Sequence, residues 1–134
     1  MAKESGLGYS VTVDNAAGSG QTISNDVTNF EFATPKAVQD VTGVDKSAFE
    51  RIHLLADFSC TLNGVFNDAS NMSHDVFKTV VSSTASRTVV LVHSGQTMTA
   101  ECLFTDYSFS RAQSGELTWS APGVLSNGTA PAWT

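Results

Sequence analysis

Side chains with the chemistry for catalysis or metal binding are few and scattered along this chain of 134 residues. The three histidines, His53, His74 and His93, do not stand at metal-ligand spacing on one predicted element, and no Cys-x-x-Cys pair accompanies them. His53 and Asp57 share one face of a predicted strand, but four residues of strand separate them by about 13 Å. That distance is too long for a catalytic dyad. We therefore expect no metal site, and we expect the histidines to face solvent or an interface.

Nucleophilic and acid–base catalysis find little more support. Serines are abundant, but no Gly-x-Ser-x-Gly motif occurs, and neither cysteine lies among basic residues. Glu101 stands beside Cys102 in an apolar run, where the simplest interpretation is the outward member of an alternating strand. Paired carboxylates for glycoside cleavage stay open at this point. No glycine-rich phosphate loop is present. We expect neither an enzyme nor a bound cofactor.

Composition and charge narrow the class of protein further. The formal net charge is −6, and the seven Lys and Arg residues are dispersed, whereas proteins that grip nucleic acid usually show a basic patch. An acidic wall that repels DNA stays open. Charged residues make up only 15% of the chain, against about 25% in an average domain. A surface with so few charges suits strands that meet neighbouring copies.

The cysteines and the apolar runs indicate a cellular compartment. Cys60 and Cys102 both fall in apolar strand patterns, so we expect small buried hydrophobic residues, although a disulfide pair is formally possible. Residues 1–6 carry no apolar segment of the signal-peptide kind. No apolar run approaches the roughly 18 residues of a membrane helix. We expect a protein kept in a reducing cytosol, without membrane contact.

The longest alternating pattern runs from Phe49 to Phe66. Apolar residues at every second position, interrupted only by Leu55, predict one strand with a dry face and a wet face. Most strands have about 5–6 residues, and a tube or barrel wall needs this length more than a small core does. The dry face comprises Ile52, Leu54, Ala56, Phe58, Cys60 and Leu62, and the wet face comprises Arg51, His53, Asp57, Ser59, Thr61 and Asn63.

The remaining patterns predict a mainly β fold, a β-sandwich or barrel with one flanking short helix. The helix is expected to begin at Ser70 or Asn71 and to end at Val80, and Pro122-Gly123 is expected to end the last strand. The chain is one domain, 1–134, with an N-terminal arm at 1–8, an extended loop at 34–46 and a C-terminal tail at 122–134. Further strands are predicted over 9–14, 21–34, 87–93, 96–104, 105–111 and 116–121.

Three runs of the sequence carry a family resemblance. They are LADFSCTLNGVFNDA at 55–69, MSHDVFKTV at 72–80 and AECLFTDYSFSRAQSGELTWSAPG at 100–123. Together they resemble the tail tube protein, or major tail protein, of long-tailed, non-contractile (siphovirus-type) phages of actinobacteria. The resemblance spans roughly residues 25–125 and rests on continuous runs instead of invariant chemistry.

This resemblance implies an architecture and partners. Family members are similar to the tubes of contractile tails and of type VI secretion, and each subunit is a β-sandwich or barrel. Six subunits form a ring whose inner sheets join into one barrel, rings stack into the tail tube, and DNA passes through the lumen without specific binding. The implied partners are other copies, together with tape measure, terminator and distal tail proteins. The implied location is the virion tail, assembled in the host cytoplasm.

The resemblance and the alternating strands together nominate two sets of site residues. The first set consists of wet-face residues that could line a lumen, with an outer solvent face as the alternative: Asp57, Ser59, Thr61, Asn63, Glu116, Thr118 and Ser120. The second set lies in a polar, extended stretch that a neighbouring ring could order: Thr34, Lys36, Asp40, Asp45 and Lys46. Both chain ends are further candidates for ring-to-ring contacts.

Other functions remain open on the sequence. A head–tail joining protein or a tail terminator would share the fold but form one ring instead of a stack. A carbohydrate-binding β-sandwich would need a row of exposed aromatic residues, and only Trp119 and Trp133 are available, with Trp119 on the apolar side of its strand.

Overall fold

A computed structural model describes residues 3–134 and confirms a mainly β protein with one short helix. Residues 1–2 of the predicted N-terminal arm lie outside the described part. The elements in chain order are β1 (Ser10–Asp14), β2 (Gly20–Thr22), β3 (Val27–Ala33), β4 (Lys36–Asp40), β5 (Arg51–Ala56), β6 (Ser59–Val65), α1 (Ser73–Phe77), β7 (Arg87–His93), β8 (Gln96–Phe104), β9 (Ser108–Arg111), β10 (Leu117–Leu125) and β11 (Ala132–Trp133).

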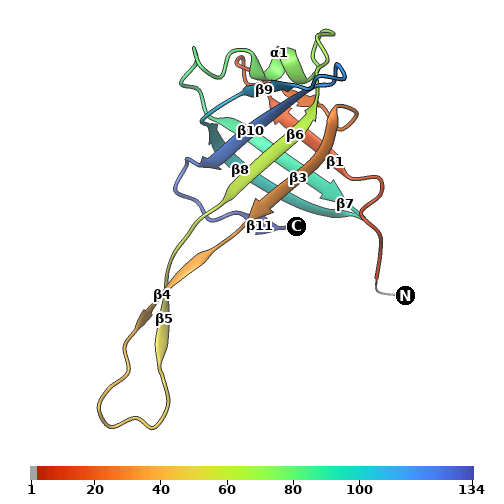
Figure 1. The fold of residues 1–134 in the computed structure, drawn as a ribbon. Coiled ribbons are helices and arrows are strands. Elements are labelled where there is room, and N and C mark those ends of the chain that lie inside the picture. Colours follow the sequence, from red (N-terminus) through yellow and green to blue (C-terminus); the bar gives the residue numbers. More distant parts are fainter. Residues whose placement is uncertain (1–2) are drawn as a thin grey trace.

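Nine strands form one antiparallel sheet that folds over on itself. Its order is β2-β1-β7-β8-β10-β6-β3, with β9 added beside β10 and β11 beside β8. The sheet bends at β8, which pairs with β7 through residues 96–102 but with β10 only at its last three residues. Figure 1 shows the result, a layer of β3, β6 and β10 that crosses over a layer of β1, β7 and β8. The predicted sandwich architecture is therefore present.

The space between the two layers is filled by apolar side chains from alternate strand positions. On β6 and β10, buried Cys60, Leu62, Trp119 and Ala121 alternate with polar neighbours, as a strand with one dry face requires. Both cysteines are buried and unpaired, as expected. The buried hydrophobic residues are Val11, Val13, Ile23, Phe58, Cys60, Leu62, Val76, Phe77, Val89, Leu91, Met98, Ala100, Cys102, Trp119 and Ala121.

The predicted single strand from Phe49 to Phe66 is wrong. The chain leaves one sheet and enters another at Asp57-Phe58, so β5 belongs to a separate two-stranded sheet with β4, and only β6 belongs to the body. On β5 the expected dry face is open, because Ile52 and Leu54 are 49% and 44% exposed. The alternation is the same in both strands, but the core covers only the second one.

Two smaller corrections concern α1 and β10. The helix is shorter than predicted, and Met72 precedes it without a side-chain cap, although Asp75 does lie in its first turn. Pro122-Gly123 does not end β10, which continues to Leu125. The Pro122 carbonyl accepts a hydrogen bond from the Thr105 amide. In a strand, the N–H and C=O of one residue point to the same side, so the N–H that proline lacks would also have faced this side of β10. The neighbour of β10 on this side changes from β9 to β8 near Pro122. No ladder bond is lost there.

The C-terminal tail is partly ordered on the body. Strand β11 pairs with β8, and Thr134 and Thr97 exchange two backbone hydrogen bonds of 2.8 and 2.9 Å. Trp133 packs against Phe32 at a ring-centroid distance of 5.9 Å. Within residues 3–134, no helix has the length and hydropathy needed to cross a membrane.

Candidate functional site

Four neighbouring strands present one continuous outer surface, which we call the polar face. Its row of strands is β9-β10-β6-β3, and Cα register places Ser120 opposite Asn63, Thr61 opposite Glu31, and Ser108 opposite Ser120. Residues directly opposite in antiparallel strands project from the same face. The outward side chains of the paired residues on these strands are Asn29, Glu31, Ala33, Ser59, Thr61, Asn63, Val65, Ser108, Ser110, Thr118, Ser120, Pro122 and Val124.

The structure brings most of the predicted lumen residues together on the polar face. Ser59, Thr61 and Asn63 come from β6, and Thr118 and Ser120 come from the adjacent β10. Two predicted members lie outside the strands. Asp57 occupies the junction between β5 and β6, and Glu116 lies in the turn closed by the hydrogen bond from the Ala112 amide to the Glu116 carbonyl, 2.9 Å. The polar face is therefore shorter at both ends than the sequence predicted.

The polar face carries hydroxyl and amide groups and almost no charge. Of the outward residues named for these four strands, Glu31 alone is acidic, and none is basic. Around Asn29, Asn63 and Thr118, the polar face is hollowed into a groove of about 300 Å³, which is lined by residues of β3, β6, β9 and β10. Asn29, Glu31, Ser108 and Ser110 were not among the predicted site residues. The alternation of Asn29 and Glu31 with Phe30 and Phe32 was the signal that could have found them.

One tight contact holds the strands beneath this groove. The register of β3 shifts between Val27 and Asn29, which brings the Asp26 carbonyl against Gly64 of β6. A Cβ on Gly64 would stand 2.1 Å from that carbonyl oxygen and 2.6 Å from the Trp119 ring. The Trp119 Nε1–H donates to the Val65 carbonyl, 2.8 Å away. Glycine is therefore required at this position.

The predicted ring-contact residues all lie on a projecting hairpin, which we call the arm and define as residues 34–57. Strands β4 and β5 pair with each other and with no strand of the body, and the backbone hydrogen bond from the Asp57 amide to the Pro35 carbonyl, 2.8 Å, closes the base. Figure 1 shows the arm leaving the body at the end away from α1. All five predicted residues are exposed, as follows: Thr34, Lys36, Asp40, Asp45 and Lys46.

Local hydrogen bonds order the far end of the arm. The Asp40 carboxylate accepts from the Thr42 amide and hydroxyl at 2.9 and 2.6 Å, and the Thr42 hydroxyl oxygen accepts from the Glu50 amide at 2.8 Å. The Thr42 hydroxyl lowers the pKa of Asp40 from its ordinary value. The arm therefore has a defined backbone although only two strands form it.

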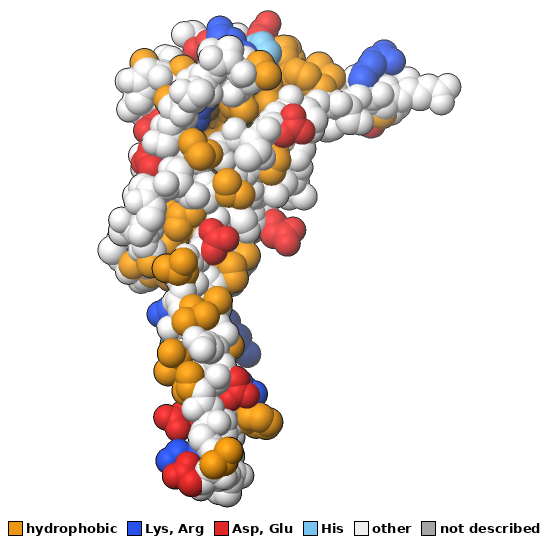
Figure 2. All heavy atoms as spheres, turned by 90° about the vertical axis from the view of Figure 1, so that its left-hand side faces the viewer, with side chains coloured by type: hydrophobic (Ala, Val, Ile, Leu, Met, Phe, Trp, Pro, Cys, Tyr) orange, Lys and Arg blue, Asp and Glu red, His pale blue; other side chains and the backbone are white. Residues whose placement is uncertain are grey.

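The arm side chains are more apolar than its polar sequence pattern indicated. Val44, Leu55 and Phe49 are 109%, 88% and 73% exposed. Figure 2 shows orange side chains distributed along the whole arm. A two-stranded hairpin is marginally stable by itself in water, and this one leaves large apolar side chains exposed.

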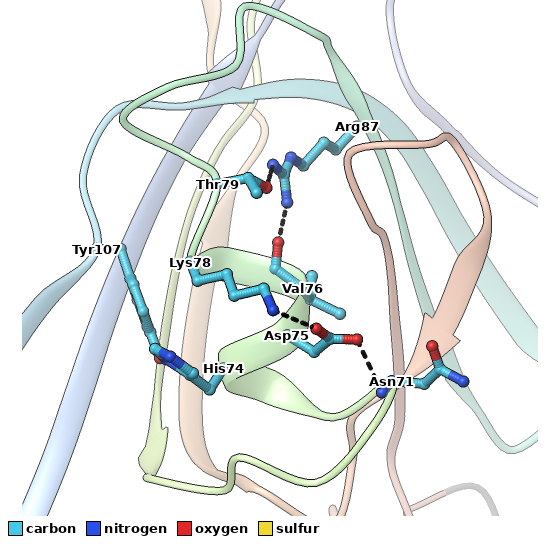
Figure 3. A network of polar contacts seen from close by, with 8 residues as sticks. All are labelled: Asn71, His74, Asp75, Val76, Lys78, Thr79, Arg87 and Tyr107. Atoms are coloured by element: carbon cyan, nitrogen blue, oxygen red, sulfur yellow. Dashed lines mark hydrogen bonds and ion pairs between the residues drawn. The ribbon is translucent and has the colours of Figure 1, made fainter.

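The opposite end of the body is built around α1. The buried Asp26 carboxylate accepts from the Asn67 side chain and from the Ser73 amide, at 2.9 and 3.0 Å. The Arg87 guanidinium reaches from β7 and donates to the Val76 carbonyl and to the Thr79 hydroxyl (Figure 3). Burial lowers the pKa of Arg87 from its ordinary value. These contacts pin α1 onto the sheets.

Aromatic rings gather beside α1. The His74 Nδ1 lies 3.1 Å from the Tyr107 hydroxyl (Figure 3), and Phe66 and Phe109 pack against the His74 ring at centroid distances of 4.9 and 6.2 Å. Burial raises the pKa of Tyr107 to about 12. We call Phe66, His74, Tyr107 and Phe109 the aromatic surface, because Phe66 and Phe109 remain 37% and 47% exposed.

The arrangement contains little that resembles an active site. Among residues 3–134, no group of three or more His, Cys, Asp or Glu is placed to hold a metal ion. The Cys60 thiol and burial raise the pKa of Cys102, which makes a reactive thiolate unfavourable there. Trp119 is buried, so the two tryptophans do not form the exposed aromatic row of a carbohydrate-binding module.

Comparison with known proteins finds solved structures that have the same fold. No protein-family model and no curated protein matches the sequence. A chain in the tail of an empty gene transfer agent (GTA) particle, a structure with C6 symmetry, superposes with a TM-score of 0.76 at 17% identity, over 98% of this chain and 99% of that chain. A chain in the virion of a native GTA particle gives a TM-score of 0.78 at 14% identity and the same coverage. The chain shares their fold. The expected tail-tube-like β fold is confirmed.

Proposed function

We propose that this protein is a structural subunit of a phage tail tube, in which stacked rings enclose a lumen for genomic DNA. Three observations support the proposal. The fold is shared with chains of GTA tail and virion structures. The sequence resembles tube proteins of long-tailed, non-contractile actinobacterial phages. Within residues 3–134, the outer edges of β3 and β9 are unpaired, and the arm exposes apolar side chains. We propose no enzymatic role, and the virion tail is the proposed location.

The proposal of a ring rests on the directions of the two edge strands, β9 and β3. In the row β9-β10-β6-β3 every neighbouring pair is antiparallel, so β9 and β3 run in opposite directions. Neither β9 nor β3 pairs with a further strand on its outer side within residues 3–134. When copies repeat around an axis that lies along the strands, β3 of one copy meets β9 of the next in antiparallel orientation. The row thus closes into a continuous barrel without an exposed edge.

In the proposed ring, the candidate residues have two different roles. The polar face forms the inner wall, where Ser59, Thr61, Asn63, Thr118 and Ser120 offer hydroxyl and amide groups and no cation to the DNA phosphates. Such a wall lets DNA slide without binding, because phosphate affinity comes chiefly from Lys and Arg. A ring of six copies agrees with the C6 symmetry of the GTA tail structure. The arm, with Thr34, Lys36, Asp40, Asp45 and Lys46, contacts the neighbouring ring, and tape measure, terminator and distal tail proteins are further proposed partners.

Negative-stain electron microscopy of the purified protein over a concentration series tests this proposal. We expect hollow tubes with a regular axial repeat. Single rings that never stack would favour a head–tail joining or tail terminator role instead. Monomers at every concentration would contradict both roles.

A further inference from the structure

Two Asn-Gly dipeptides occur in this chain, at Asn63-Gly64 and at Asn127-Gly128. An asparagine followed by glycine loses its side-chain amide readily, because glycine has no side chain to hinder attack by its main-chain nitrogen. Asn63 lies in β6, on the polar face, whereas Asn127 lies in the connection from β10 to β11. The same chemistry is therefore present in two different settings, and the fold decides which of them can react.

The first dipeptide is held in an extended ladder. Gly64 lies opposite Trp119 of β10 on one side and opposite Val27 of β3 on the other. Its backbone is also tightly packed, since a Cβ would stand 2.1 Å from the Asp26 carbonyl oxygen. Attack of the Gly64 nitrogen on the Asn63 side chain requires rotation of the peptide between them, which would disrupt this pairing. Asn63 is therefore protected while β6 is in place.

The second dipeptide stands in an open turn. Ser126 precedes it and is fixed to the body, because its amide and hydroxyl donate to the Glu101 carbonyl at 2.9 and 3.2 Å. Beyond Ser126, both Asn127 and Gly128 are exposed. Gly128 has a φ of 72°, which glycine adopts freely, and nothing lies within 4 Å of the position that a Cβ would take there. Packing does not oppose rotation of this peptide.

The Asn127 side chain is already folded towards its own main chain. Its Oδ1 accepts a hydrogen bond of 3.1 Å from the Thr129 amide, the contact typical of an Asx turn. The ring that this bond closes contains the two atoms that would react, the Asn127 Cγ and the Gly128 nitrogen. The bond also polarises the side-chain carbonyl and stabilises negative charge that develops on Oδ1. The turn therefore holds the nucleophile and the electrophile together.

We propose that Asn127 is a site of spontaneous deamidation. The Gly128 nitrogen gives its proton to hydroxide and attacks the Asn127 Cγ, and the tetrahedral intermediate expels ammonia, which takes its last proton from water. The product is a cyclic succinimide. Water then cleaves the bond from the Gly128 nitrogen to Cγ, which gives aspartate, or the bond to the main-chain carbonyl carbon, which gives isoaspartate. The net reaction consumes water and releases ammonia, without oxidant, reductant or enzyme.

The reaction would alter the base of the arm. Gly128 lines a groove of about 700 Å³ together with Lys36 and Asp57, and Figure 1 shows the connection from β10 to β11 at the end of the body from which the arm leaves. Deamidation adds a carboxylate there, in a chain whose formal net charge is already −6. The isoaspartyl form also inserts a methylene group into the main chain between β10 and β11. These changes belong to the folded subunit and do not depend on assembly into a tube.

Peptide mass spectrometry of the full chain tests the site. The folded protein, kept below the concentration of assembly, is incubated in H₂¹⁸O at mildly alkaline pH and then digested in ordinary water, so that ¹⁸O marks only deamidation that occurred in the folded state. We expect labelled aspartate and isoaspartate at position 127, and at least about tenfold less label at position 63, because attack there first requires local opening of β6. Equal labelling of both positions, more label at 63, or none at 127 would overturn the inference.

Urea and a matched variant separate the effect of the fold from that of the dipeptide. In urea, Asn63 and Asn127 are expected to be labelled at similar rates, because both dipeptides are then exposed. A preference for Asn127 that persists undiminished in urea would assign the selectivity to neighbouring sequence and contradict the role of the fold. Asn127→Gln keeps the amide but must close a larger ring, so it should lose the labelling at position 127 and leave position 63 unchanged. Undiminished labelling at position 127 in this variant would contradict the mechanism.

Discussion

Gly64 is the residue on which the polar face depends most directly. Its backbone passes beneath the Asp26 carbonyl and the Trp119 ring, and both lie well inside the contact distance of a Cβ. The Trp119 indole is fixed in turn by its hydrogen bond to Val65. No single neighbour can move aside without disturbing a second one, because the carbonyl belongs to the backbone and the indole is buried.

We therefore expect Gly64→Ala to destabilise the protein by at least the roughly 1–3 kcal/mol typical of overpacking. Urea unfolding followed by tryptophan fluorescence, at protein concentrations below assembly, measures the change. Gly6→Ala is the control, since no atom lies within 4 Å of the position that a Cβ would take there, and its backbone is not left-handed. Wild-type stability in Gly64→Ala would show that β3 can shift away from β6.

For single residues, the sequence predicted correctly which face a side chain points to when the alternation along its own strand decides it. Ser59, Thr61 and Asn63 alternate with buried Cys60 and Leu62, so their common face could be predicted. The requirement for Gly64 could not be predicted, because it arises from a register shift in β3 and a ring from β10. Both neighbours are distant in sequence.

The arm is the element with the clearest separate role. It shares no strand pairing with the body, and its apolar side chains are exposed. Its removal therefore takes no contact from the buried core, whose members all lie outside residues 34–57.

We expect replacement of residues 36–55 by a short Gly-Ser linker to leave the body folded and the rings intact but to abolish stacking. Near-ultraviolet circular dichroism checks the fold, and electron microscopy checks the assembly. Gln39→Ser, a change at an exposed polar arm position, serves as the control and should give normal tubes. Tubes of normal length from the shortened protein would contradict the role of the arm.

The arm also shows why the long strand was predicted wrongly. The alternation of Ile52 and Leu54 with Arg51 and His53 correctly indicates a strand with two different faces. A local pattern does not say whose atoms cover the apolar face. In β6 the chain's own core covers it, whereas in β5 nothing within residues 3–134 does. For this reason periodicity alone predicts one continuous strand where the structure has two, β5 in the arm and β6 in the body.

For the whole molecule, the proposed tube raises the question of which surface faces its lumen. The polar face and the outer face of β1, β7 and β8 lie on opposite sides of the core. The native cysteines are buried, so an introduced cysteine reports its own location.

We expect a bulky maleimide to label Thr61→Cys far more slowly in assembled tubes than in dissociated protein, because the polar face is reached only through the tube ends. Mass spectrometry follows the reaction. Thr99→Cys is the control, since Thr99 is exposed on β8 beside β11 and should react at similar rates in both states. Equal accessibility of Thr61→Cys in tubes and in free subunits would place the polar face on the outside.

The two kinds of free surface have a mechanical consequence. Neighbours within a ring would be joined by main-chain hydrogen bonds between the edges of β3 and β9, whereas neighbours along the axis would be joined through side chains of a hairpin that has no support from its own body. Such a tube resists bursting more strongly than it resists bending. Under load it should flex and fracture between rings and leave intact hoops, which allows a long tail to curve while its bore stays open.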